Sequence, residues 1–406
     1  MFTSKKVRTA LFTAVVLLIC LLMYFFYQSP EKAYNEQGGT SYASYEKAKV
    51  LRVISEDLAK DPADGGLYHG TQQLEVKILS GEHRGEIHTI TNYLSPYINV
   101  LTKKGQTIVV NVDSADHQNY FVTVYSQYRA PLLAFMILLF FGVLWAIGGK
   151  KGLKSVLGIL FTFASIFYLF IPMLYRGYSP ILASVVVGVL TTCITLLLLN
   201  GWSSKSIAAI LGTTVGVVIT GAIAYILGEL LQISGFNTKE VEVLLIVAQQ
   251  TGMQLKGLLF AGIMLATLGA IIDVGISIAS SVYEVYMANP TLSKKELFLS
   301  GINVGRDMMG TMANTLILAF TGTTLSSLMI LYAMKVHFTQ LTNMNMVTIE
   351  VIQGITGCFG VVLTVPIVAF ISSRMMPRFE KVINNKVERN LNLNEREDNK
   401  IIKNML

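Results

Sequence analysis

One carboxylate stands inside a long apolar stretch in the second half of the chain. Asp273 belongs to the run LGAIIDVGISIAS, residues 268–280, in which no other side chain ionises. A carboxylate in such a place can take up and release a proton or hold a small cation. Keeping it ionised at the centre of a lone membrane helix costs about 2.5–3.5 kcal/mol. The sequence therefore predicts that Asp273 faces protein or a path for ions, and that it has a functional role.

The neighbours of Asp273 share one side of a predicted helix. Small and polar residues recur at spacings of four and three, which aligns them on one face; they are Gly262, Ala266, Gly269, Asp273, Ser277 and Ser280. Small side chains let a second helix approach closely. We therefore expect a helix-packing seam that includes Gly262, Gly269 and Ser277 and has Asp273 in its middle.

The next apolar span carries a matching polar face within GINVGRDMMGTMANTL, residues 301–316. Its polar and small residues have the same helical spacing, with one arginine alongside; they are Asn303, Arg306, Asp307, Gly310 and Asn314. We expect Asp273 and Asn314 at similar depth, and the other polar residues further along an ion, proton or substrate path, with Gly310 in the packing seam. Two other interpretations stay open: interhelical hydrogen bonding, and Arg306 with Asp307 marking the end of the span.

The piece that joins these two spans has a helix stop and a helix start. Asn289 and Pro290 end one helix, and Ser293 with Glu296 forms a capping box for the next. We expect a short helix here that lies on the membrane surface before the following span begins.

Other kinds of chemistry find no support in the sequence. There is no P-loop and no H-E-x-x-H zinc motif. Cys20, Cys193 and Cys358 lie in apolar runs and have neither zinc-site nor disulfide-framework spacing. His83 and His88 hint at a metal, but we expect them on opposite faces of a strand pair. The chain is therefore expected to be no enzyme and to hold no metal or other cofactor.

The composition is that of a membrane protein. Hydrophobic residues make up 52% and charged residues 14% of the 406 residues, against roughly 25% charged residues in soluble domains. The net charge of +7 does not indicate a nucleic-acid partner, because much of the excess lies beside apolar spans and in the C-terminal tail. There it sets orientation and meets anionic lipid. The lipid bilayer is thus the first expected partner.

Eight windows are long and apolar enough for the roughly 20 residues of a membrane span. They are Ala10–Tyr27, Pro131–Ile147, Leu153–Leu174, Ile181–Leu199, Ile207–Leu231, Gly257–Ser280, Met308–Ala333 and Val351–Ser373. The first is preceded by basic residues and followed by no A-x-A cleavage site, which indicates an uncleaved signal anchor. Residues 241–256 are too short and too rich in glutamine to span, so we expect an interfacial or re-entrant helix there.

The lysines and arginines favour one orientation, with both termini in the cytoplasm, because they gather in alternate loops. The segment between the first two spans then lies outside the membrane. Its five short runs alternate in polarity and are punctuated by turn residues such as LSGEHRGE and TKKGQ, which predicts a small closed β-barrel of the OB or SH3-like kind. The expected order is a signal anchor (1–29), an extracytoplasmic β-domain (30–129), a seven-helix membrane domain (130–376) and a charged cytoplasmic tail (377–406).

The block from Leu268 to Phe320 resembles the YibE/F family of bacterial multi-pass membrane proteins. The resemblance extends to ILSGEHRGE in the β-domain, GGKKGLKSVLG between the second and third spans and GVVLTVPIVAF in the last span. It implies a plasma-membrane protein for which transport is the usual assumption. It also implies a partner, either a second, shorter YibE/F-type membrane protein or another copy of the chain.

Together these observations predict a secondary transporter or efflux permease that is coupled to protons or another ion through Asp273. The alternative is a membrane scaffold or assembly subunit that does not transport and whose exported domain binds a partner. A cavity beside the Asp273 stripe that opens to one side would favour transport. Tight packing over that stripe would favour the scaffold.

Overall fold

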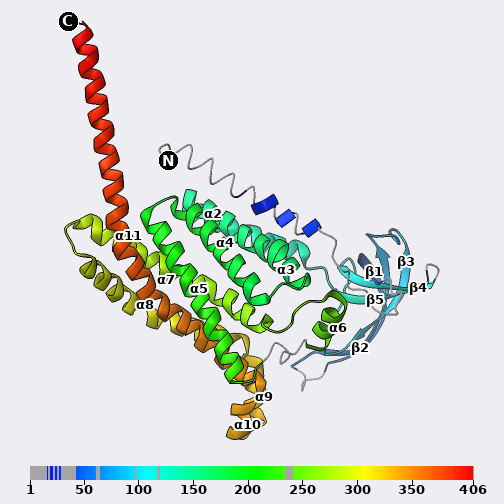
Figure 1. Cartoon of the computed structure of the whole chain (residues 1–406). Coiled ribbons are helices and arrows are strands. Elements are labelled where there is room, and N and C mark those ends of the chain that lie inside the picture. The colour runs from blue at the N-terminus through cyan, green and yellow to red at the C-terminus, as the bar shows by residue number, and fades with distance from the viewer. Residues whose placement is uncertain are drawn as a thin grey trace. The chain divides into compact units, whose positions relative to one another are not determined.

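The computed structural model describes residues 43–60, 65–96, 98–116, 119–233 and 241–405, with a few positions between 16 and 28. The chain forms two compact units (Figure 1). One comprises Asn35–Val143 and is called the β unit below. The other comprises Met1–Tyr34 with Leu144–Leu406 and is called the helical unit.

The β unit is a five-stranded antiparallel sheet in the order β3-β2-β1-β4-β5. The strands are β1 (Ser44–Lys60), β2 (Tyr68–Ile78), β3 (Ile87–Leu94), β4 (Thr107–Asp116) and β5 (Asn119–Gln127). Alternate residues of these strands, among them Val50, Leu74 and Ile108, are fully buried in one core, as expected for strands with one buried face. The edge strands β3 and β5 also contact each other, so the sheet curls toward closure. All five predicted strands are confirmed.

The predicted turn LSGEHRGE joins β2 to β3 and depends on two glycines. Gly81 and Gly85 have φ angles of 74° and 100°, in the left-handed region that favours glycine. A Cβ on Gly81 would also collide with the Glu46 carboxylate. Glu46 is buried and accepts hydrogen bonds from Ser44 and Ser80, so the turn is held against the first strand.

Eleven helical elements follow the sheet in the described residues; the first begins in the β unit, and from Leu144 onward they belong to the helical unit. They are α2 (Ala130–Ser165), η1 (Ile166–Phe170), α3 (Ile171–Tyr175), α4 (Pro180–Asn200), α5 (Ser204–Leu230), α6 (Val241–Thr251), α7 (Leu258–Ala288), α8 (Lys294–Thr323), α9 (Leu325–Ala333), α10 (Phe338–Asn343) and α11 (Asn345–Met405). Within the described part, five helices are long and apolar enough to cross a membrane, or six if α8 and α9 form one bent span.

The C-terminal helix α11 lies at the centre of this unit and contacts α5, α7 and α8. Glycines make the close contacts: a Cβ on Gly212 of α5 would lie 3.0 Å from the Val368 backbone, and one on Gly301 of α8 would lie 2.8 Å from Ala369. Gly305 of α8 similarly faces Val365. Small residues at helix crossings are typical of membrane bundles, where close packing drives association.

The first predicted span, Ala10–Tyr27, lies largely outside the described residues. Two of its described side chains, Ile19 and Met23, are buried in the same cluster as Met173 and Val187. The predicted tail, residues 377–406, coincides with the C-terminal part of α11, drawn toward red in Figure 1.

The second and third predicted spans form one helical stretch, Ala130–Tyr175. It is interrupted at Gly149, whose φ of 54° and ψ of −131° are not helical. A Cβ on Gly152 would collide with the Leu144 carbonyl, so the chain folds tightly within the GGKKG segment. The two arms on either side of Gly149 correspond to the two predicted windows.

One expectation about α8 is wrong. The capping box is present, with Ser293 N–H donating to Glu296 and Glu296 N–H donating to Ser293, but the helix it starts runs uninterrupted to Thr323. No separate surface helix precedes the span. The predicted span Met308–Ala333 corresponds to the end of α8 together with α9, and the chain bends by 65° between these two helices. Hydroxyls of Thr323 and Thr324 both donate to the Phe320 carbonyl, and such bonds compete with the helical ladder.

Candidate site on α7, α8 and α11

Asp273 lies halfway along α7 on the side that faces away from the core. Ile271, Val274 and Ile278, on the opposite side of the helix, are fully buried. Asp273 is exposed, together with Gly262, Ala266 and Gly269, and Ser277 is half-exposed. A Cβ at Gly262 or Gly269 would meet no atom within 4 Å. The structure therefore does not place the α7 stripe (Gly262, Ala266, Gly269, Asp273 and Ser277) between two helices of the chain.

The polar side of α8 is exposed as well. Asn303, Arg306, Asp307 and Asn314 are all exposed, and a Cβ at Gly310 would meet open space. The opposite side of the helix, with Leu297, Gly301 and Gly305, is buried. The α8 stripe (Asn303, Arg306, Asp307, Gly310 and Asn314) thus points away from the contact with α11.

The two stripes lie at matching levels but do not bond to each other. Asp273 and Met309 are equally far along the chain from Thr291 in the loop between the helices, so the equal rise per residue of two helices puts Asp273 level with the part of α8 between Asp307 and Asn314. Within the described part, no side-chain hydrogen bond or ion pair involves Asp273, Arg306, Asp307 or either asparagine. The arrangement leaves two carboxylates and one guanidinium open to water, ions or another chain.

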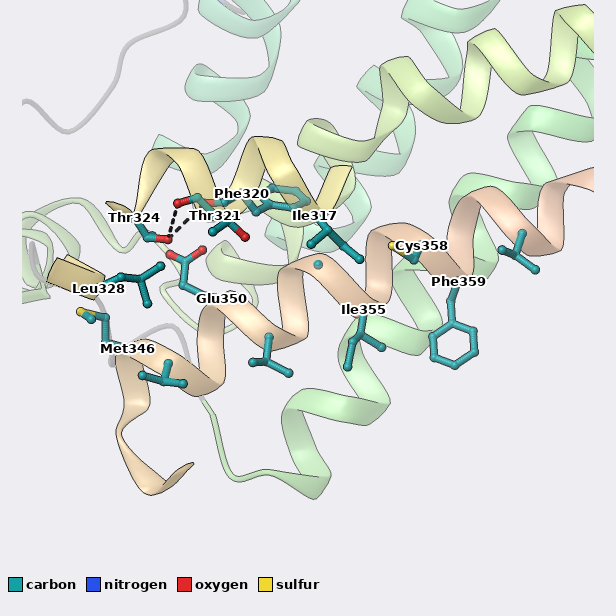
Figure 2. Close-up of a pocket in the computed structure, with 14 residues that line it drawn as sticks. Ile317, Phe320, Thr321, Thr324, Leu328, Met346, Glu350, Ile355, Cys358 and Phe359 are labelled. Carbon is teal, nitrogen blue, oxygen red and sulfur yellow. Dashed lines mark hydrogen bonds between the residues drawn. The ribbon is translucent and has the colours of Figure 1, made fainter. Parts of the chain in front are cut away.

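The α8 stripe leads to a pocket. The heptad spacing of Asn303, Gly310 and Ile317 continues to Thr324, at the end of α8. There α8, α9 and the first turns of α11 line an open pocket of about 580 Å³ (Figure 2). Its walls are mostly apolar, and Glu350 is the one acidic or basic side chain among the lining residues.

Sequence reasoning missed Glu350, because the last predicted span begins one residue later. Glu350, Gly354 and Cys358 recur every four residues and all line the pocket. That periodicity, with an acidic residue in the first turns of an apolar helix, was the available signal. Figure 2 shows the carboxylate pointing toward Thr321 and Thr324 of α8.

Residues 241–256 contain no helix long enough to count as a membrane span. They form the short apolar helix α6 and a connection to α7. Gln254 donates a hydrogen bond to the Gly177 carbonyl over 2.8 Å, and Lys256 pairs with Glu229 at 3.0 Å. That hydrogen-bonded pairing raises the pKa of Lys256. The connection is thereby tied to the ends of α3 and α5.

The expectation that His83 and His88 point to opposite faces is wrong. Both rings lie beside Tyr120, at 3.9 and 5.3 Å between ring centroids, and both contact the Glu86 carboxylate. His83 belongs to the turn, so the two-residue period of a strand does not apply to it. The described residues contain no group of three or more His, Cys, Asp or Glu that could hold a metal ion.

In this β-unit cluster, the Tyr120 hydroxyl donates to the Glu86 carboxylate. That bond, followed by the one to His88, lowers the pKa of Glu86. Burial, followed by the same bond to Glu86, raises the pKa of Tyr120 to about 12. The cluster joins β5 to the start of β3, at the edge where the sheet approaches closure.

Comparison with protein-family models assigns both parts of the chain. Residues 136–378 match the model described as YibE/F-like protein, and residues 41–127 match the YibE/F family N-terminal domain. The chain belongs to the YibE/F family. The first match contains the α7 stripe, the α8 stripe and the Glu350 pocket, and the second contains the whole sheet. No curated protein and no solved structure matches the chain.

Proposed function

We propose that this YibE/F family member is a secondary transporter or efflux permease of the bacterial plasma membrane. In this proposal, Asp273 binds a proton or another cation during the cycle. The observation that carries the proposal is a carboxylate halfway along an apolar helix, exposed on a stripe of small residues and level with a second polar stripe on α8.

The energetics of the bilayer support this reading. Placing an ionised side chain at the centre of a span in contact with lipid costs about 2.5–3.5 kcal/mol. Asp273 and Asp307 both lie in the middle part of their helices. Intramembrane ionisable groups usually face a bundle interior or a water-filled path. We infer that the two stripes border such a path, which a second membrane chain closes. This second chain would be either another copy of the same chain or a second YibE/F-type protein.

The proposed topology has eight crossings. The first apolar segment and the two arms on either side of Gly149 supply three, and α4, α5, α7, the bent pair α8 and α9, and α11 supply five. Lysines and arginines in alternate loops then favour cytoplasmic termini and an extracytoplasmic β unit. The sheet order, with β3 and β5 in contact at the open edge, supports an OB-type barrel over an SH3-like one.

The test is complementation of a deletion strain, screened for sensitivity to ions and metabolites. We expect Asp273→Asn to keep the protein at its normal level in the membrane and to abolish rescue. The matched control is Glu284→Gln, which makes the same change at an exposed acid in the last turns of α7 and should rescue fully. Full rescue by Asp273→Asn would overturn the ion-coupling role and favour the non-transporting scaffold.

A further inference from the structure

The Glu350 pocket has the size and lining of a ligand site. Its volume of about 580 Å³ lies within the range of roughly 300–1,000 Å³ for small-molecule sites, which are typically apolar with a few polar groups. It is formed by elements of the helical unit alone. None of the residues of the α7 stripe lines it, so it is distinct from the proposed coupling site.

The charge in this pocket is placed at one end. Glu350 lies in the first turns of α11 and is half-buried, and Figure 2 shows its carboxylate directed at the end of α8. The Thr324 hydroxyl beside it donates to backbone carbonyls at 3.1 and 3.3 Å. From there the walls run along α11 as apolar side chains, ending at Phe359 and Val362. The pocket is thus anionic at one end and apolar along its length.

Such a site complements an amphiphile with one positive charge. The Glu350 carboxylate makes this end of the pocket negative, which favours a positively charged head over a neutral one of the same shape. A cationic head at Glu350 forms a charge-assisted contact, while the rings of Phe320 and Phe359 can receive an apolar or aromatic body.

We propose that the Glu350 pocket binds a hydrophobic cation, namely a molecule with a single ammonium or similar head and an apolar body. The proposal thereby names a substrate class for the proposed transporter. Only the claim that the bound cation is transported rests on the proposed function. Binding itself requires no turnover and no contribution from Asp273.

The experiment uses the full chain in lipid nanodiscs and two fluorescent probes that share the same apolar body and differ only in charge. A dansyl group on a pentylamine chain carries the positive charge, and its N-acetylated form is neutral. Fluorescence titration, corrected for empty nanodiscs, should show the amine binding about tenfold more tightly, as expected for one contact to a charged group. Glu350→Gln should remove that preference and leave the affinity for the acetylated form unchanged.

A second variant tests the cavity itself. A Cβ at Gly354 would meet open space, so Gly354→Leu should extend into the pocket without disturbing the helix contacts and should weaken both probes. If the leucine variant gives too little folded protein, Gly354→Ala makes a smaller change at the same position. Glu242→Gln, at an exposed acid on α6, is the control and should bind like the wild type.

Three results would overturn the proposal. Equal binding of the two probes to the wild type would mean that the pocket takes neutral amphiphiles or lipid. Unchanged binding in both Gly354 variants would place the probes elsewhere, and a preference retained in Glu350→Gln would exclude the carboxylate. Asp273→Asn should bind normally, so failure of coupling at Asp273 is distinguishable from failure of this site.

Discussion

At the scale of single residues, the Tyr120 and Glu86 pair in the β unit has a pH-dependent contribution that follows from its two pKa shifts. The pKa of Glu86 is lowered in the fold, so its contribution to stability is present above the ordinary carboxyl pKa and lost as pH falls through the lowered value. The pKa of Tyr120 is raised to about 12, so its contribution is present below the ordinary tyrosine pKa of about 10 and lost as pH rises toward 12.

We therefore predict that Tyr120→Phe lowers the thermal midpoint of the β unit at pH 7. The difference from the wild type should shrink as the pH falls below the ordinary carboxyl range and through the lowered pKa of Glu86. Circular dichroism of a fragment covering residues 41–128 measures the thermal midpoints of the wild type and the variant at both pH values. Tyr125→Phe, at an exposed tyrosine on the same strand, is the control and should change little at either pH. A difference for Tyr120→Phe that does not depend on pH would show that the bond to Glu86 contributes nothing.

At the scale of elements, the two faces of α8 behave as different environments for the same residue type. Gly305 is buried against Val365 of α11, whereas Gly310 faces open space. An added methyl group at Gly305 would force α8 away from α11 or displace Val365. The same group at Gly310 meets nothing within the chain.

We predict that Gly305→Ala destabilises the helical unit by about 1–3 kcal/mol, the usual cost of overpacking, partly offset by the better helix propensity of alanine. Gly310→Ala should be neutral or slightly stabilising, by at most about 1 kcal/mol. Size-exclusion chromatography after heating in detergent compares the two variants. Equal melting behaviour would mean that the contact between α8 and α11 does not limit stability.

At the scale of the whole molecule, the two units have separate cores. The buried clusters of the helical unit contain no residue of the sheet, and the β-unit cluster contains no residue of the helices. We therefore predict that a chain lacking residues 40–126 still inserts into the membrane and loses function. A C-terminal tag reports the membrane level, and complementation of the deletion strain reports function. Full complementation would show that the β unit is dispensable.

The open stripes give a second prediction at this scale, about assembly. In a background without Cys20, Cys193 and Cys358, we expect Gly269→Cys or Gly310→Cys to cross-link through a short bis-maleimide to a neighbouring chain in native membranes. Leu182→Cys, at an exposed apolar position of α4, is the control and should remain a single chain. A single-chain product from all three variants would mean that the stripes border water without a second chain.

Several features of this protein were determined by its sequence alone. The excess of apolar residues identified a membrane protein, since so many apolar side chains cannot be covered by so few charges. Alternation in polarity located the strands, and the capping box located the start of α8, because both depend on residues close together in the chain. Helical spacing also identified which residues share the stripes of Asp273 and Asn314.

The tertiary structure decided which way those stripes face. Periodicity shows which residues share one side of a helix, but it does not show whether that side packs against another helix. Two glycines of α8 illustrate this difference. Gly305 and Gly310 are alike in sequence, but only Gly305 meets α11, because another helix far along the chain supplies the contact. For the same reason the pocket at Glu350 was not predicted: its walls come from α8, α9 and α11, which only the folded chain brings together.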